Sequence, residues 1–253
     1  MTRIITDNDR LRREWEELEA GDIIVGRIRL KESEEHLLLD LKERGLILCP
    51  SALSQAVSRS KVLQSHIYEA YMLPYTVPVH DRHGLLEVLN NYHEAEIKQV
   101  VSKLDRKNAG LGINLWPSME DLYNQASLGG LPYPFVVQPF MEGIRDIRVV
   151  VLGEYVEAYY RDNSRNFRNN LHCGGSFRAC TLSDEQWQIC RRVMKRGDFP
   201  YAHIDLMVTP EGATYFTEIN LRGGIKGAVI TAPEYQERVS RIHNDFIKKE
   251  KTA

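Results

Sequence analysis

The sequence predicts an α+β fold, and three observations support this prediction. Short apolar runs with the alternation typical of strands are interspersed with segments whose apolar residues recur at helical spacing. Two pairs of these runs are separated by short turns, at Gly153-Glu154 and Glu211-Gly212, as in antiparallel hairpins. The 253 residues, 43% of them hydrophobic, are enough for one large domain or two modest ones.

Residues 1–55 are expected to form a small α/β unit. Apolar residues recur at helical spacing up to Leu18, and Gly45 permits a left-handed cap at the end of a second helix. The expected elements are an opening helix through Leu18, a strand over 22–30, a helix over 33–44 and a strand over 46–49. This order predicts a βαβ-like arrangement.

Helices and strands continue to alternate after residue 55. Ser183 and Gln186 have the spacing of a capping box, which predicts the start of a helix. In the hairpin around Gly153-Glu154, the register places Asp146 opposite Arg161. The other expected elements are helices over 60–72, 84–93, 183–196 and from 233, and strands over 76–79, 97–103, 135–140, 146–152, 155–161, 202–209 and 214–220.

Charge and composition argue against several classes of protein. The formal net charge of -2 gives no basic excess for binding nucleic acid. The sequence contains neither an apolar signal core nor an apolar run long enough to span a membrane. Its four cysteines lack C-x-x-C spacing and are too few for a disulfide scaffold. We therefore expect a cytoplasmic protein with no membrane partner.

The second hairpin carries the most informative polar residues. If Glu211-Gly212 is a two-residue turn, Asp205 lies opposite Glu218 and His203 opposite Asn220 on one face. A three-residue turn would break this register. The other face is apolar and carries Ile204, Leu206 and Val208.

Paired carboxylates on one face of a hairpin require compensation. Like charges directly opposite each other destabilise a sheet by up to ~1 kcal/mol. Oxygen ligands suit Mg²⁺ or Mn²⁺, and Mg²⁺ commonly binds together with phosphate. Asp205, Glu218 and Asn220 are therefore candidate metal ligands for nucleotide chemistry. The alternative is an exposed hairpin with solvated carboxylates.

Two further segments suggest nucleotide binding. Lys103 ends a strand and precedes a loop with Gly110 and Gly112, whose backbone N–H groups can lie along a polyphosphate. An ordinary hairpin loop is the alternative, because the Walker pattern is absent. Gln138 and Phe140 flank Pro139 at the end of an apolar strand, where they can contact an adenine edge, although a simple strand end explains them as well.

A polar stretch between Arg161 and Arg178 is expected to form a mobile loop whose Arg168 and neighbouring asparagines close over a charged intermediate. A solvated surface loop and an RNA-contacting loop are the alternatives. Structural roles are expected for His172 and His203.

Several of these segments share an order and spacing along the chain. The segments are Ser58–Lys61, Val101–Lys103 with Gly110–Gly112, Val137–Phe140, Asp146–Arg148, Phe167–His172 with Gly174 and Gly175, Asp205, and Glu218–Asn220. Together they resemble the ATP-grasp superfamily, with the nearest likeness to RimK-type glutamate ligases and a more distant one to glutathione synthetase. The resemblance covers residues 45–230.

The resemblance implies an ATP-grasp fold in which two α+β lobes clasp ATP after a shortened N-terminal α/β unit. The implied boundaries are 1–55 for the N-terminal unit and 56–253 for the ATP-grasp domain. Within that domain, 56–134 is the smaller nucleotide lobe and 135–253 the larger metal-binding lobe.

The resemblance also implies a role for each motif residue. Phosphates are contacted by Lys61, Lys103, the loop residues Gly110 and Gly112, and Arg168, Asn169 and Asn170. Of these, Arg168 and Asn170 act on the acyl phosphate as catalytic residues. The adenine hinge is lined by Gln138, Pro139 and Phe140, the nucleotide is contacted by Asp146, and one or two Mg²⁺ (or Mn²⁺) ions are held by Asp205, Glu218 and Asn220.

The implied activity is that of an ATP- and Mg²⁺-dependent carboxylate–amine ligase. ATP phosphorylates a substrate carboxylate, and an amine then displaces phosphate to form an amide. The implied partners are ATP, a carboxylate and an amine acceptor such as glutamate, a peptide or a protein tail, with a homo-oligomer left open. An ATP-binding regulatory or scaffold protein without ligase activity is the alternative.

The sequence departs from the family pattern at three places. Asp105–Ala109 replace a glycine-serine-rich start of the phosphate loop, which suggests a stiffer and more basic lid. Arg222-Gly-Gly224 stand where the pattern usually ends in Pro-Gly, and the N-terminal unit is shorter than usual. These departures leave the acyl and amine substrates undetermined.

Overall fold

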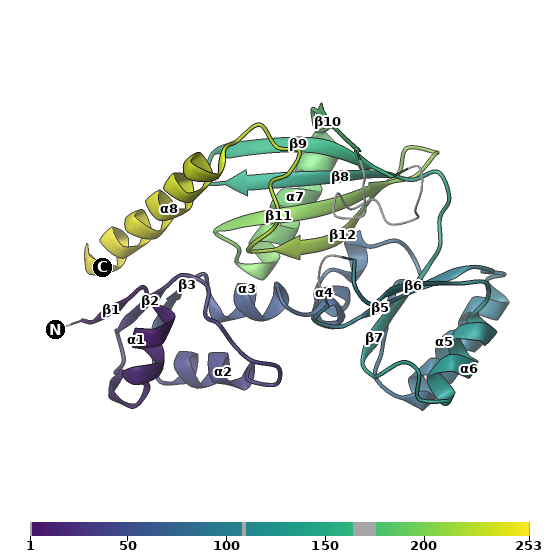
Figure 1. Cartoon of the computed structure of the whole chain (residues 1–253), viewed down its shortest axis with the longest axis horizontal. Helices are drawn as coiled ribbons and strands as arrows, with labels where there is room; N and C mark the ends of the chain where they lie inside the picture. The colour runs from purple at the N-terminus through teal and green to yellow at the C-terminus, as the bar shows by residue number, and fades with distance from the viewer. Residues whose placement is uncertain (1, 108–109, 164–175, 253) are drawn as a thin grey trace.

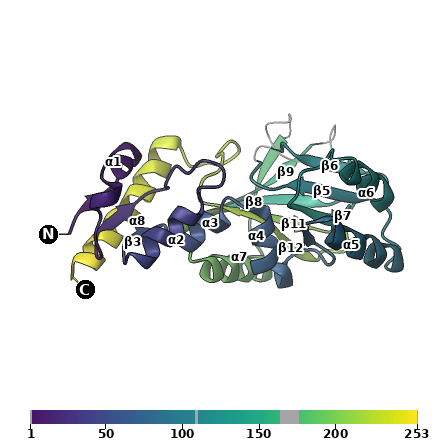
Figure 2. The same ribbon diagram turned by 90° about the horizontal axis from the view of Figure 1, so that it is seen from below.

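The computed structural model describes residues 2–107, 110–163 and 176–252 and contains three separate β-sheets (Figure 1). The N-terminal sheet and the C-terminal helix lie at one end of the molecule, and the four-stranded sheet lies at the other (Figures 1 and 2). The predicted α+β fold is confirmed.

The N-terminal sheet is parallel, in the order β1-β2-β3. Its elements are β1 (Ile4–Ile5), α1 (Asn8–Arg13), a 3₁₀ helix (Trp15–Glu17), β2 (Ile23–Val25), α2 (His36–Glu43) and β3 (Ile47–Cys49). The predicted βαβ order is correct, but two predicted ends are wrong. Gly26 has a φ of +104° and ends β2, while Ser33, with a φ of +68°, cannot start a helix.

The four-stranded sheet is antiparallel, in the order β4-β7-β5-β6. Helices α5 and α6 pack on it around a shared apolar core (Figure 1). The elements from the N-terminal sheet onward are α3 (Ala52–Val57), α4 (Lys61–Ile67), a 3₁₀ helix (Glu69–Tyr71), β4 (Val77–Val79), α5 (Arg82–Glu94), β5 (Val100–Leu104), β6 (Ile113–Trp116), α6 (Met119–Ser127) and β7 (Phe135–Pro139).

Strand β7 belongs to this four-stranded sheet, where it pairs with β4 and β5. The sequence interpretation placed residues 135–253 in the larger lobe. In the structure, the chain leaves the smaller sheet only after Pro139. The lobe boundaries themselves stay a prediction.

The five-stranded sheet is antiparallel, in the order β10-β9-β8-β11-β12. Both predicted bonds of the capping box at Ser183 and Gln186 are present at the start of α7. Strands β9 and β10 extend further into the segment between Arg161 and Arg178 than predicted, because Asp162 still belongs to β9 and Ser176 starts β10. The elements are β8 (Arg145–Leu152), β9 (Tyr155–Asp162), β10 (Ser176–Cys180), α7 (Asp184–Gly197), β11 (Tyr201–Val208), β12 (Thr214–Asn220) and α8 (Ala232–Thr252).

In the β11–β12 hairpin, Asp205 and Glu218 pair as predicted, but the turn that joins the strands differs from the predicted one. The turn contains three residues, 210–212, because the Thr209 N–H donates to the Ala213 carbonyl at 2.9 Å. The two-residue turn predicted at Glu211-Gly212 is therefore wrong. A β-bulge at Thr217 adds one residue to β12 and restores the pairing of Asp205 with Glu218.

Gln64 on α4 joins this helix to β12 at the base of the site. Its amide nitrogen donates to the carbonyls of Val57 and Ile219 at 2.9 and 3.0 Å, and its amide oxygen accepts from the Ile219 N–H at 3.0 Å. Gln64 is buried, so these bonds satisfy peptide groups that water does not reach.

We expect Gln64→Met to lower the free energy of unfolding by about 2 kcal/mol or more. The methionine has a similar volume but leaves buried peptide groups without partners, at ~1–3 kcal/mol each. Urea unfolding followed by circular dichroism measures this change. Gln188→Met, at an exposed position of α7, is the control and should change stability by less than ~0.5 kcal/mol. Equal effects of the two variants would contradict the role assigned to Gln64.

Candidate functional site

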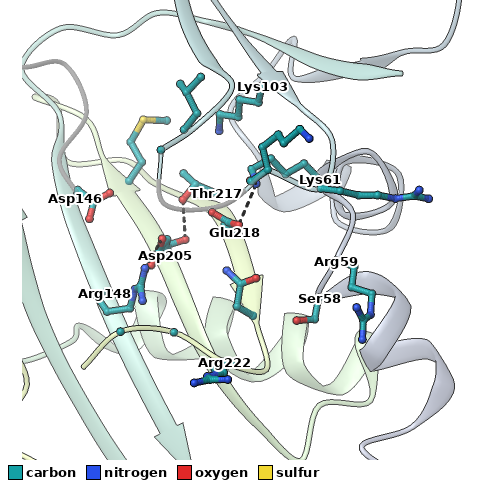
Figure 3. A pocket seen from close by; sticks show the side chains of 18 of the residues that line it. Ser58, Arg59, Lys61, Lys103, Asp146, Arg148, Asp205, Thr217, Glu218 and Arg222 are labelled. Atoms are coloured by element: carbon teal, nitrogen blue, oxygen red, sulfur yellow. Dashed lines mark hydrogen bonds and ion pairs between the residues drawn. The ribbon is translucent and has the colours of Figure 1, made fainter. Parts of the chain in front are cut away.

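A cavity of about 870 Å³ lies between the four-stranded and five-stranded sheets, beside the segment that follows β2 (Figure 3). Its walls come from the segment after β2, the turn between α3 and α4, strand β5, the end of β7, and strands β8, β9, β11 and β12. Its lining includes eleven basic and five acidic side chains. This excess of positive charge favours anionic ligands.

The cavity brings together most of the residues predicted for the site. Nine of them line it: Lys61, Lys103, Gly110, Gln138, Phe140, Asp146, Asp205, Glu218 and Asn220. Arg168, Asn169, Asn170 and His172 lie outside the described residues.

Two predicted residues, Gly112 and Pro139, do not line the cavity. Pro139 is buried within β7. Gly112 has a φ of +73°, and a Cβ atom there would lie 2.8 Å from the Leu104 Cβ. The structure therefore explains this glycine by the close approach of two loop ends.

Asp205 on β11 is held between two arginines at the floor of the cavity. The Arg148 guanidinium binds both its oxygens, with Nη2 at 3.0 Å from Oδ2, and Arg161 Nη2 lies 2.9 Å from the same oxygen. Arg161 Nε also donates to Asp146 at 2.6 Å. The pairing of the strands brings these four side chains together, because Arg148 lies opposite Asp205 and Arg161 lies opposite Asp146.

These ion pairs determine the charge of the two carboxylates. Burial alone would raise the pKa of Asp205, but Arg148 and Arg161 outweigh it and lower the pKa to about 2. Burial, together with the nearby Asp205 charge, raises the pKa of Asp146 despite its pair with Arg161. Asp205 therefore stays ionised at ordinary pH values.

Two lysines lie on the opposite wall near Glu218 (Figure 3). Lys61 Nζ is 3.3 Å from Glu218 Oε1 and donates to the Lys107 carbonyl at 2.6 Å. Burial, with the neighbouring charge of Lys61, lowers the pKa of Lys103 to about 8, although Glu218 and other carboxylates partly oppose this shift. A bound anion would relieve the repulsion between the two amines.

The loop after β5 is attached to α4 through Asp105. The Ser60 hydroxyl and the Val62 N–H donate to Asp105 Oδ1 at 3.0 and 3.1 Å. Arg106 pairs with Glu35 of the N-terminal unit at 3.3 Å. The residues that replace the family's glycine-serine pattern therefore connect the loop to two other parts of the chain.

The oxygen donors on the hairpin fit a hard divalent cation. Two carboxylate oxygens offer about four acceptor positions, and the described contacts to Asp205 use three of them. Glu218 and Asn220 line the same cavity. Among the described residues, no group of three or more His, Cys, Asp or Glu side chains could hold a metal. Asn220 and ligand oxygens would therefore have to complete the coordination.

His203 and Gly223 support the arginine at the cavity floor. His203 Nε2 lies 2.9 Å from the Tyr235 hydroxyl, and burial lowers the pKa of this imidazole to about 3, so it is neutral. A Cβ atom at Gly223 would lie 2.6 Å from Arg148 Nη1 and 2.7 Å from His203. These contacts indicate the structural role expected for His203.

The sequence interpretation predicted Lys61 and Lys103 but assigned no role to most of the arginines of the lining. Arg148 occurred in a quoted motif but received no role, although the register of β8 and β11 places it opposite Asp205. Arg59 likewise occurred in a quoted motif without a role, and Arg27 and Arg106 come from segments that are distant from the hairpin in sequence.

Comparisons with known proteins agree with this geometry. A family model described as the RimK-like ATP-grasp domain matches residues 81–233. A probable alpha-L-glutamate ligase of Trichodesmium erythraeum is 29% identical over 183 residues, which cover 69% of this chain and 60% of that protein. The chain thus spans less than two thirds of the length of this curated relative.

Two solved structures are similar to the whole fold. The D-alanine-D-alanine ligase from Coxiella burnetii aligns with a TM-score of 0.65 at 15% identity, covering 91% of this chain and 71% of that one. An ATP-grasp ligase of Chryseobacterium gregarium, solved with ADP and a leader and core peptide, aligns with a TM-score of 0.63 at 16% identity, covering 88% and 76%. With more than half of its residues matched by the family model, this chain belongs to the RimK-like ATP-grasp family.

Proposed function

We propose that this protein is an ATP- and Mg²⁺-dependent carboxylate–amine ligase that forms an amide bond through an acyl phosphate. The observation that carries this proposal is the position of Lys61 and Lys103 beside Glu218, on the face of the hairpin that also holds Asp205. Amines next to hard oxygen donors provide what a metal–triphosphate complex requires.

The residues around the lysines suggest how the nucleotide is held. Lys61 and Lys103 neutralise phosphate charge, and Gly110 brings the backbone of the loop to the cavity. Gln138 and Phe140 offer an amide and an aromatic ring for the adenine. Asp146 is assigned a nucleotide contact, as the family resemblance implies.

Glu218, Asn220 and Asp205 are the residues that would hold one or two divalent ions. A bound Mg²⁺ or Mn²⁺ neutralises phosphate charge and polarises the phosphoryl group being transferred. Asp205 supplies a permanent negative charge to this set, because its pKa is about 2.

The reaction takes place in two steps. A substrate carboxylate oxygen attacks the γ-phosphorus, the bond to ADP breaks, and an acyl phosphate forms. An amine then attacks the acyl carbon, phosphate leaves and the amine loses a proton. The protein contributes positioning and charge neutralisation, and Arg148, which lines the cavity and binds Asp205, is the arginine to which we assign stabilisation of the developing negative charge. Arg168 and Asn170 stay predicted catalytic residues.

The names of the relatives suggest the class of substrate. One relative is named for alpha-L-glutamate, and one solved ligase was bound to a peptide. We therefore assign an amino acid such as glutamate, a peptide or a protein tail to the acyl and amine positions. Free thiols at Cys49, Cys180 and Cys190 support a cytoplasmic location. The described helices include none with the length and hydrophobicity of a membrane span.

The direct test measures ADP release from ATP–Mg²⁺ with a panel of amino acids and peptides, and identifies the product by mass spectrometry. A new amide establishes the ligase. Tight ATP binding without an amide for any amine would favour the ATP-binding scaffold instead. Failure of the folded protein to bind ATP–Mg²⁺ at millimolar concentration would remove both functions.

We expect Glu218→Gln to lower turnover by about 100-fold or more, because an electrostatic contact to the transferring group is lost. Asp205→Asn should also lose turnover, with lower stability, because it weakens the pairing of two enclosed guanidinium groups. Turnover and urea unfolding are measured for both. Glu211→Gln, in the exposed turn of the same hairpin, is the control. Unchanged turnover in Glu218→Gln would remove this residue from the mechanism.

We expect nucleotide affinity to fall about tenfold for each pH unit above 8. The lowered pKa means that free Lys103 loses its charge through about pH 8, and only the protonated amine attracts phosphate. Titrating a fluorescent ATP analogue between pH 7 and 9.5 measures the slope. Lys103→Arg stays charged over this range and should flatten it, whereas the exposed Lys98→Arg should not. The same slope in Lys103→Arg would contradict the assignment.

A further inference from the structure

Three arginines line the cavity beyond the hairpin carboxylates: Arg27, Arg59 and Arg222, here called the arginine group. Figure 3 shows Arg59 and Arg222 near Ser58, with Glu218 between them and Lys103. They come from three separate segments, after β2, between α3 and α4, and after β12. The cavity thus has a basic region at each end.

Hydrogen bonds hold the three segments together. The Ile28 N–H donates to the buried Gln55 amide oxygen at 2.8 Å, and the Arg59 guanidinium donates to the Ile28 carbonyl. The Leu221 N–H donates to the Ser58 hydroxyl oxygen at 2.9 Å, which places Arg222 beside the same turn. The arginine group is therefore held on a fixed backbone rather than on free loop ends.

None of the three arginines forms an ion pair with a residue that the structure describes. Arg59 Nε is buried and has no hydrogen-bond partner within these residues. Partial burial and the neighbouring Arg222 both lower the pKa of Arg27, and burial and the neighbouring Arg27 lower that of Arg59. Like charges gathered at one end of a cavity repel one another, and a bound anion would offset this repulsion.

The carboxylates of the cavity lining do not supply this anion. Glu35 pairs with Arg106, Glu218 pairs with Lys61, and Asp146 and Asp205 pair with Arg148 and Arg161. Glu32 is exposed, and no ion pair joins it to a described arginine. Arg27 and Arg222 remain accessible to a ligand, because both are exposed.

We propose that the arginine group binds a second anionic group of the acyl substrate, so that the substrate is a dicarboxylate or a phosphorylated carboxylate. This proposal rests on the proposed ligase function. One carboxylate lies toward Glu218 and is phosphorylated, while the guanidinium groups hold the other anion. Planar guanidinium groups suit this task because they bind carboxylate or phosphate oxygens in pairs.

Hydroxylamine isolates the choice of acyl substrate from that of the amine. The substrate carboxylate takes the γ-phosphoryl group of ATP and ADP leaves. Hydroxylamine nitrogen then attacks the acyl carbon, phosphate leaves and a hydroxamate forms with loss of a proton. Hydroxamate is measured for succinate, glutarate and adipate against butyrate, pentanoate and hexanoate, which match them in carbon number. O-phospho-L-serine tests phosphate as the second anion.

We expect dianions to give hydroxamate with a KM about tenfold or more below that of the matched monoanions. Arg27→Gln and Arg222→Gln should each raise the KM for the dianion about tenfold, with little change in kcat or in ATP affinity. Arg29→Gln removes a charge from the same segment but lies outside the cavity lining, and it should leave KM unchanged. If the two arginines only stabilise the fold, the variants should instead lower the ATP affinity and the stability of the protein together.

Equal KM values for dianions and monoanions, or for the variants and the wild type, would overturn the proposal while leaving the ligase function intact. If no carboxylate gives hydroxamate, the ligase function fails, and calorimetric titration with glutarate and O-phospho-L-serine decides the arginine group separately. If either probe binds and Arg27→Gln weakens this binding, the anion site is supported independently of the ligase function. No binding of either probe would overturn it.

Discussion

The ion pairs around Asp205 connect three adjacent strands and fix the floor of the cavity. An enclosed carboxylate is too costly without partners, and here Arg148 from β8 and Arg161 from β9 both face it. The same pairs keep Asp205 ionised. The two guanidinium groups also offset its negative charge, so Asp205 attracts a further cation less strongly. A metal held by Asp205 on this face would therefore also need Glu218, Asn220 and the oxygens of a bound phosphate, which would couple metal binding to nucleotide binding.

The bulge at Thr217 determines whether the hairpin can serve as a site. Without it, the three-residue turn would pair Asp205 with the wrong neighbour and send Glu218 to the apolar side. The Thr217 hydroxyl donates to the Asp205 carbonyl at 3.0 Å, which attaches the extra residue to the strand it passes. A local irregularity thus places two carboxylates on one face.

Elements with strong local signals could be predicted from the sequence. The capping box before α7 and the β8–β9 register follow from spacing alone, whereas the predicted pairing of Asp205 with Glu218 is reached only through the bulge at Thr217. Strand β6 was missed because it has only four residues and none of them is buried, and α6 was missed although Ser118 caps it. The arginine group could not be predicted, because its place in the site depends on the packing of three segments that are distant in sequence.

The short N-terminal unit takes part in the site despite its size. It supplies Arg27 to one end of the cavity, and its Glu35 pairs with Arg106 in the loop after β5. The loop proposed to contact phosphates and the arginine proposed to bind substrate are therefore both attached to the same small unit. Asp105 of this loop also binds the start of α4, next to Lys61. A conformational change at the nucleotide end of the cavity would therefore be transmitted to the arginine group through few contacts. Linked occupancy of the two ends would favour phosphoryl transfer only when both anions are present.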